Sequence, residues 1–446
     1  MITEQPQPQG FMHWLKESVT VKLAFIGILT LLLLIPSFMV DNLITERAQR
    51  QQKTISEVSD QYSGDQLIQG PVLVIPYREL VTRAGTDKKE EVIQNLYVLP
   101  NELYYKGKLT SEVLHRGIYE VPVYNGLIKV SGNFTKADLG SLSINPDKLM
   151  PEKASLLFSI SDLKGLKTNP QVAIAGQTIT AEPAAGDKLF ANSLQVDVNL
   201  QGLIDKTIPF EFTLDLKGSQ ELSFLHTGKT TDVELSGNWP SPSFDGRYLP
   251  DTRIINNEGF SAKWRMLYYN RPFPQQWVQD TGLLTNEKKA ADATFGVKLK
   301  MPVDEYQKTM RTSKYGILII MLTFVSLFLT EMVRKQKVHV FNYILIGAAM
   351  IIYYTLLLSF SEQVGYNIAY LIASVATVAL IATFLASLLK NSKAAIVFTI
   401  ILTLFYSFIY VIIQLEDLSL LIGSIALFII VAALMYSSRK INWDNK

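Results

Sequence analysis

Long apolar runs dominate the C-terminal part of the chain. The five runs cover residues 316–333, 341–360, 366–389, 394–413 and 418–436. Each run is about long enough to cross a hydrocarbon core of ~30 Å as a helix. Because only a few residues separate one run from the next, consecutive helices must run antiparallel. We therefore predict a membrane domain of five helices over residues 316–437.

The charged residues between these runs alternate in sign. Basic residues fill the first and third breaks and follow the last run, whereas the second and fourth breaks are acidic. The basic residues are Arg334, Lys335, Lys337, Lys390, Lys393, Arg439 and Lys440, and the acidic ones are Glu362, Glu416 and Asp417. Since basic loops stay in the cytoplasm, the pattern predicts a cytoplasmic C-terminal tail over residues 438–446.

Another apolar run, residues 23–40, follows Lys16 and Lys22 near the N-terminus. A basic start and an apolar run are also typical of a cleaved signal peptide. This run is longer than the usual apolar region of such a peptide, and no small-residue cleavage site follows it. We therefore expect a cytoplasmic tail over 1–18 and an uncleaved transmembrane helix over 19–40, with Pro36 kinking it or marking its exit. The predicted helices then number six.

The residues between this helix and the membrane domain are polar overall. Residues 41–63 favour a helix that continues outward as a stalk, and helical periodicity stops at Ser63 and Gly64. A second helical stalk is expected over residues 302–315. Because both stalks join the outer ends of membrane helices, the segment between them, residues 64–301, is expected on the outer side of the membrane.

Short β-type runs fill residues 64–301. They cover residues 72–75, 92–99, 118–124, 127–134, 156–160, 194–200, 210–216, 222–225, 233–235, 260–266 and 294–299. Four alternate apolar positions mark the clearest half-buried strand: Phe210, Phe212, Leu214 and Leu216. Many short strands without intervening helices predict an antiparallel, all-β domain that is sandwich-like or made of two sheets.

Residues that could support catalysis or cofactor binding are sparse. The chain has no cysteine, which excludes disulfides and thiolate chemistry. The four histidines lie far apart: His13, His115, His226 and His339. Residues 223–230, SFLHTGKT, imitate the end of a phosphate-binding loop, but Ser223 replaces its first glycine. Acidic and basic residues nearly balance between 41 and 313, unlike in a nucleic-acid binder. We expect no catalytic residues, cofactor, metal, nucleotide or nucleic acid.

The central parts of the six predicted helices contain no ionisable residue. Glu331, near one helix end, is the closest exception, and we interpret it as half of a local surface pair with Arg334 or Lys335 worth under ~1 kcal/mol. Ion-coupled transporters usually keep charged groups in the membrane, so coupled transport is disfavoured. Hydroxyl groups are expected to hold helices together by hydrogen bonds; they belong to Tyr353, Tyr354, Thr355, Ser374, Thr377 and Tyr406.

A Trp-Pro segment, residues 238–250, is the candidate binding site. Trp239, Phe244, Arg247 and Tyr248 lie there beside the turn-forming Asp245-Gly246 pair. One alternative is a long connection whose Trp and Phe fill the β core. The other is an ordered surface loop that presents these four side chains to a partner or envelope ligand, since aromatic residues dominate binding hot spots.

Three segments carry a resemblance to a known family. They are SGNWPSPSFDGRYLP at 236–250, GPVLVIPY at 70–77 and DEYQKTMRTSKYGILII at 304–320. With them, the chain resembles the bacterial inner-membrane protein family CreD, described as cell-envelope integrity proteins. The resemblance implies an inner-membrane protein with one N-terminal helix, a large periplasmic region and a cluster of membrane helices near the C-terminus. It also implies a role in envelope homeostasis, with expression tied to a two-component stress response, and it assigns no catalytic residue.

Two functions follow as expectations. The first is a non-enzymatic inner-membrane protein that supports envelope integrity by binding or scaffolding through its periplasmic domain. Its partners would be the lipid bilayer and envelope proteins or envelope ligands. The alternative is a transporter or a protein that handles lipids or envelope precursors, with the β domain collecting substrate. A hydrolase in the outer domain would need a cluster of carboxylates or a Ser/His/Asp set that sequence alone does not display.

Overall fold

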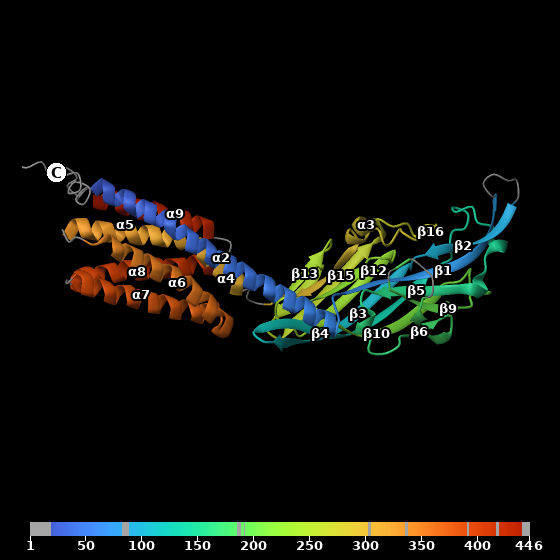
Figure 1. The fold of residues 1–446 in the computed structure, drawn as a ribbon. Helices are drawn as coiled ribbons and strands as arrows, with labels where there is room; N and C mark the ends of the chain where they lie inside the picture. The colour runs from blue at the N-terminus through green and yellow to red at the C-terminus, as the bar shows by residue number, and fades with distance from the viewer. Residues whose placement is uncertain are drawn as a thin grey trace, which may run out of the picture. The chain divides into compact units, whose positions relative to one another are not determined.

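The computed structural model describes residues 19–82, 89–184, 189–190, 192–301, 305–334, 338–389, 392–415 and 419–438. The chain forms two compact units, shown as ribbons in Figure 1. The helical unit comprises Met1–Gln51 and Val303–Lys446, and the β unit comprises Gln52–Pro302. A membrane protein with an α-helical part and a large inserted all-β part is therefore confirmed.

Seven helices make up the described part of the helical unit: α2 (Val19–Tyr62, which extends into the β unit), α4 (Glu305–Lys314), α5 (Gly316–Arg334), α6 (Val340–Val364), α7 (Tyr366–Leu389), α8 (Ser392–Gln414) and α9 (Ser419–Ser438). Five stretches are long and apolar enough to cross a membrane, namely Val21–Tyr62, Glu305–Met332, Val340–Val364, Tyr366–Leu388 and Lys393–Gln414. The comparable stretch within α9, Leu421–Ala432, is shorter. The sixth span therefore stays a prediction.

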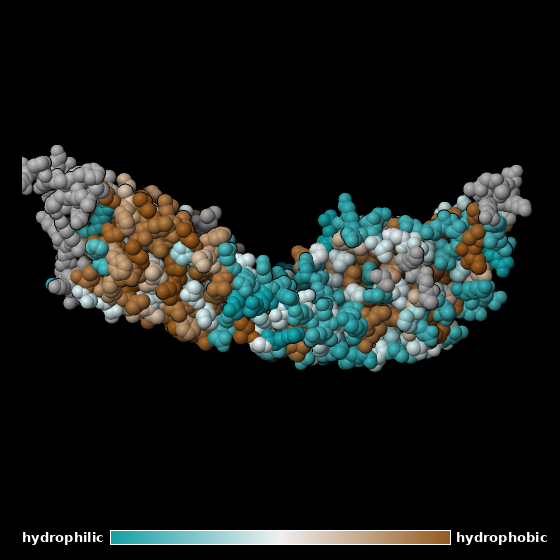
Figure 2. Space-filling view, viewed as in Figure 1, coloured by the Kyte–Doolittle hydropathy of each residue, from teal (hydrophilic) through white to brown (hydrophobic). Residues whose placement is uncertain are grey.

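Helix α2 shows how an apolar helix divides its faces. Ile26, Leu29 and Leu33 repeat at helical spacing and are buried, and Leu33 packs against Gly347 of α6. Phe38 and Met39 point outward with about two-thirds of their surface exposed, at 66% and 67%. Exposed apolar side chains of this kind suit contact with lipid, and Figure 2 shows a hydrophobic surface over the helices. Pro36 lies inside α2, which continues to Tyr62.

The β unit contains two sheets. The nine-stranded sheet has the order β13-β17-β11-β1-β5-β9-β8, with β2 on β1 and β16 on β2, and the eight-stranded sheet has the order β14-β15-β12-β3-β4-β10-β6-β7. The bounds are β1 Gln66–Thr82, β2 Lys89–Val98, β3 Glu102–Arg116, β4 Tyr119–Phe134, β5 Ala154–Ile160, β6 Gln171–Ile174, β7 Gln177–Thr180, β8 Glu182–Pro183, β9 Ser193–Val198, β10 Ile208–Ser219, β11 Glu221–Leu225, β12 Thr230–Gly237, β13 Pro242–Gly246, β14 Thr252–Asn256, β15 Gly259–Leu267, β16 Gln276–Val278 and β17 Thr294–Leu299. A short helix, α3 (Glu287–Ala291), precedes β17.

Side chains from both sheets form one continuous core. Phe158 of β5 stacks on Phe212 of β10 with ring centroids 4.6 Å apart, which joins the nine-stranded sheet to the eight-stranded one. Trp264 of β15 and Phe295 of β17 make a second such contact at 5.6 Å. This shared core is the arrangement expected of a β-sandwich, as predicted.

The antiparallel prediction holds for most strand pairs but is wrong for two. Strand β1 pairs with β11 in parallel, with Gln66 opposite Leu222. Strand β3 pairs with β12 in parallel, with Glu102 opposite Thr230. Parallel neighbours require a long connection between them, and here each connection consists of other strands of the same unit.

Two central strands differ from their prediction. Strand β3 was not predicted, yet it has an alternating burial pattern from Leu103 onward, with Leu103, Tyr105 and Leu109 buried. Strand β4 is continuous where two separate strands were predicted. Gly126 lies in its middle, and a Cβ atom there would approach the Leu109 side chain to 3.1 Å. The glycine at 126 therefore allows β4 to pack closely against β3 and does not form a turn.

Candidate functional site

Trp239, the centre of the predicted binding segment, is a core residue. Only 6% of its surface is exposed, and it packs in the core shared by the two sheets. Its indole Nε1 donates a hydrogen bond of 2.9 Å to the carbonyl of Lys300. A buried indole offers little surface to a partner, and this burial favours the alternative in which Trp239 fills the β core.

The other three predicted residues do not form one binding surface. Phe244 lies in β13, half-buried, with its ring edge-on to Trp264 at 5.7 Å. The Tyr248 hydroxyl donates to the carbonyl of Asn270, and the Tyr248 carbonyl accepts from the indole of Trp264 at 3.1 Å. The Arg247 side chain alone is exposed. The segment mainly closes one side of the β core.

The segment that imitates a phosphate-binding loop has a structural role. It connects β11 to β12, whereas a phosphate-binding loop is followed by a helix. His226 is fully buried and bonds to the Thr231 hydroxyl at 2.9 Å. Burial, together with the nearby positive charge of Arg271, lowers the pKa of His226 to about 4, so the imidazole is neutral near pH 7. Over the part of the chain that the structure describes, no cluster of His, Asp or Glu could hold a metal ion.

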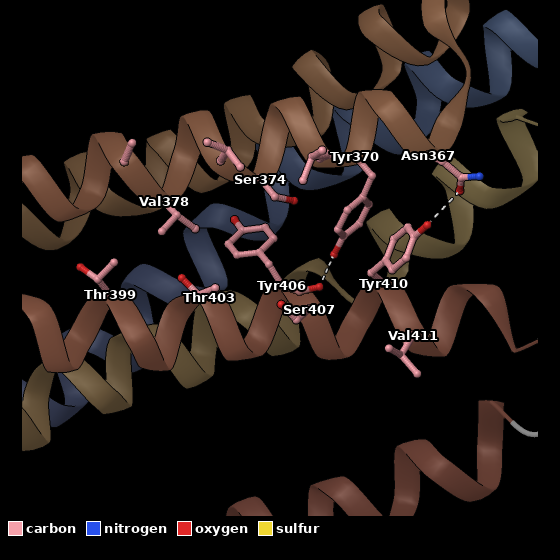
Figure 3. Close-up of a pocket in the computed structure, with 13 residues that line it drawn as sticks. Asn367, Tyr370, Ser374, Val378, Thr399, Thr403, Tyr406, Ser407, Tyr410 and Val411 are labelled. Atoms are coloured by element: carbon pink, nitrogen blue, oxygen red, sulfur yellow. Dashed lines mark hydrogen bonds between the residues drawn. The ribbon is translucent and has the colours of Figure 1, made fainter.

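The helical unit contains a cavity of about 660 Å³ between α7 and α8 (Figure 3). This volume falls within the range of small-molecule sites. Its walls carry no charged side chain. They are formed by Asn367, Tyr370, Leu371, Ser374, Val375, Val378, Ala379, Thr399, Thr403, Tyr406, Ser407, Tyr410 and Val411.

Helical spacing explains how the lining residues come together. On α8, Thr399, Thr403 and Ser407 are four residues apart and therefore share one face. On α7, Ser374 and Val378 are also four residues apart, and Figure 3 shows them facing α8. The cavity is thus mainly apolar, and its α8 wall carries a line of hydroxyl groups.

Two hydroxyl groups in this wall lack a hydrogen-bond partner among the described residues. They are the Tyr406 hydroxyl and Ser374 Oγ, and their residues are only 2% and 8% exposed. Figure 3 shows Tyr406 extending from α8 toward α7, while its backbone carbonyl accepts from the Tyr370 hydroxyl at 2.6 Å. A buried hydroxyl without a partner costs roughly 1–3 kcal/mol. Because both oxygen atoms are fully buried, they lie within the packed wall and do not face the open space of the cavity.

Buried tyrosine rings continue behind the cavity. Tyr353 of α6 contacts Tyr406 and Tyr354 with ring centroids 4.8 Å apart in each case. The sequence predicted that these hydroxyls hold helices together by hydrogen bonds. The structure does not confirm that prediction for four of them, which make no hydrogen bond of standard geometry with the described residues: Tyr353, Tyr354, Ser374 and Tyr406. Ring packing connects the helices here, together with the hydrogen bond from the Tyr370 hydroxyl of α7 to the Tyr406 carbonyl of α8.

Glu331 has a partner that the sequence did not predict. It is 8% exposed and pairs with Lys22 of α2. It also accepts a hydrogen bond of 3.2 Å from the Tyr343 hydroxyl, while Lys22 donates to the carbonyl of Val338 at 2.9 Å. The predicted partner Lys335 lies outside the described residues. Glu331 therefore takes part in a partly buried pair that connects α2 with α5, and its predicted local pair with Arg334 or Lys335 stays a prediction.

Comparison with known proteins gives one consistent result. The family model described as "Inner membrane protein CreD" matches residues 18–444. A curated relative with that same description, from Escherichia coli strain K12, is 29% identical over 417 residues, which cover 93% of this chain and 91% of the relative. The match spans the helical unit and the β unit together.

Proposed function

Because the chain belongs to the CreD family of inner membrane proteins, we propose that it is a non-catalytic lipid-binding protein of the cell envelope. In this proposal the helical unit holds one lipid chain in the cavity between α7 and α8. The β unit lies in the periplasm, where it supports envelope integrity. This function corresponds to the lipid-handling alternative, and the cavity is the observation that favours it over scaffolding alone.

The shape and chemistry of the cavity support a lipid chain as its occupant. The lining extends along α7 from Asn367 to Ala379, which is about 18 Å at 1.5 Å per residue. That length is more than half of a ~30 Å hydrocarbon core. Uncharged, mainly apolar walls suit an aliphatic chain.

The lipid-binding proposal is tested by filling the cavity. Replacing Thr403 with tryptophan places a bulky ring in the channel and is expected to lower the amount of bound lipid at least fivefold. The matched control is Leu404→Trp: Leu404 is the next residue on α8 and is also exposed, but it does not line the cavity. Native mass spectrometry of the full chain, after incubation with phosphatidylethanolamine and phosphatidylglycerol vesicles, counts the bound lipid. Equal retention by Thr403→Trp and the wild type would refute the proposal.

The alternation of loop charges supports a periplasmic β unit and cytoplasmic termini. Alkaline phosphatase is active only outside the cytoplasm, so fusions after Gly64 or Gly259 are expected to be active. A fusion after Lys337 is expected to be inactive. Enzyme activity in whole cells, normalised to fusion abundance on an immunoblot, checks the orientation, and an active fusion at Lys337 would contradict it.

Scaffolding through the β unit is the second candidate. The edge strand β14 favours it, since Ile254 and Ile255 are 68% and 47% exposed there. An exposed apolar edge strand can pair with a strand from another protein. If Thr403→Trp leaves lipid binding intact, this candidate replaces lipid binding as the proposed function.

A further inference from the structure

We propose that the cavity selects an amphiphile with an anionic headgroup, and that Lys308 of α4 binds that headgroup. The inference rests on the proposed lipid-binding function and names the class of its ligand. The chain of the ligand lies between α7 and α8. Its phosphate or carboxylate lies at the end of the cavity formed by Asn367 and Tyr410.

Lys308 has neutral partners. Its ammonium donates to Oε1 of Gln414 at 3.4 Å and lies over the ring of Tyr366, 5.8 Å from the centroid. Among the described residues, no carboxylate lies within ion-pair distance of this ammonium. A partly buried cation surrounded by neutral groups loses hydration without gaining a counter-charge. An anionic headgroup would supply that charge.

The neighbouring carboxylates already have partners of their own. Glu305 accepts a hydrogen bond from the backbone N–H of Tyr366. Glu362 accepts from the Tyr306 hydroxyl at 2.9 Å and lies 3.9 Å from Arg47. Both acidic side chains therefore have partners other than Lys308, and neither forms an ion pair with it.

A line of polar groups connects Lys308 to the cavity. The Gln414 amide that accepts from Lys308 donates in turn to Oδ1 of Asn367 at 2.5 Å. The same oxygen accepts from the Tyr410 hydroxyl at 3.4 Å, and both Asn367 and Tyr410 line the cavity. A headgroup bound by Lys308 would therefore lie beside the Asn367 and Tyr410 end of the cavity. The polar groups there can hydrogen-bond to it.

The anionic group could be the phosphate of a phospholipid or the carboxylate of a free fatty acid. The test therefore uses phosphatidylglycerol, phosphatidylcholine with the same acyl chains, and palmitate. The wild type in detergent is expected to retain phosphatidylglycerol about tenfold more than phosphatidylcholine, as a charge-assisted contact allows. Palmitate that displaces phosphatidylglycerol assigns the site to a carboxylate amphiphile, and its failure to do so assigns the site to a phosphodiester. Both outcomes support an anionic headgroup.

Three substitutions isolate the role of Lys308. Lys308→Gln is expected to reduce the tenfold preference to near parity, whereas Lys308→Arg retains the charge and the preference. Lys314→Gln is the control, since Lys314 is an exposed cation on the same helix. An unchanged preference in Lys308→Gln, or no preference in the wild type, would overturn the inference.

The cavity-filling variant separates this inference from the proposed function. Thr403→Trp should lower the binding of both phospholipids, whereas Lys308→Gln should remove only the preference between them. If Thr403→Trp loses lipid but Lys308→Gln keeps the preference for phosphatidylglycerol, only the headgroup contact is refuted. Lipid retained in Thr403→Trp would refute the lipid-binding function itself.

Discussion

Replacing Trp239 with alanine is expected to destabilise the β unit by about 3–5 kcal/mol. The substitution removes a large ring from the core shared by the two sheets, where Trp239 is only 6% exposed. It also leaves the Lys300 carbonyl without the 2.9 Å hydrogen bond from the indole. At roughly 2–4 °C per kcal/mol for a unit of this size, the unfolding midpoint should fall by roughly 10 °C.

Pulse proteolysis of the full chain at rising temperature measures this effect. Arg247→Ala is the control within the same segment, because its side chain is exposed and such changes usually stay within about 0.5 kcal/mol. Trp239→Phe should fall between the two, since it keeps an aromatic ring but loses the hydrogen bond. A wild-type midpoint for Trp239→Ala would show that the ring does not support the core.

Replacing Lys22 with methionine is expected to destabilise the helical unit by about 3 kcal/mol. The change leaves the carboxylate of Glu331 without its cation, although Glu331 is only 8% exposed. Breaking a buried ion pair from one side costs more than the pair itself contributes, because an uncompensated charge stays behind. The double variant Lys22→Met/Glu331→Met removes both charges and should recover most of the lost stability.

The measurement is the midpoint of thermal unfolding in detergent. Size-exclusion chromatography of heated samples monitors the unfolding. Arg50→Met is the control on the same helix, since Arg50 and Glu46 form a pair at 3.3 Å whose side chains are 58% and 61% exposed. Exposed pairs of this kind contribute roughly 0.5 kcal/mol or less. A double variant as unstable as Lys22→Met alone would contradict the explanation.

The apolar runs predicted the membrane helices closely because hydropathy is a local property of the chain. The run at 366–389 coincides with α7, and the run at 341–360 lies within α6. Strand β3 was missed because Glu102, Lys106 and Lys108 alternate with its buried residues and dilute the apolar signal. The parallel pairing of β3 with β12 depends on distant residues, and no local pattern reveals it.

The candidate site left a partial signal in the sequence. Hydroxyl residues recur every four positions along α8 at Thr399, Thr403 and Ser407, a pattern that marks one face of the helix. The sequence did not show that α7 faces them. The pairing of Glu331 with Lys22 could not be predicted from local sequence either, because Lys22 lies 309 residues earlier in the chain.

The two parallel strand pairs have a consequence during biosynthesis. The chain is made from its N-terminus, and Gln66 pairs with Leu222, which follows roughly 150 residues later. At about 5–20 residues per second, β1 waits roughly 8–30 s before the ribosome has made its partner β11. Strand β3 waits almost as long for β12. For that interval both sheets present an unpaired edge, which is a template for aggregation. We therefore expect the nascent β unit to be most prone to aggregation before β12 has been synthesised.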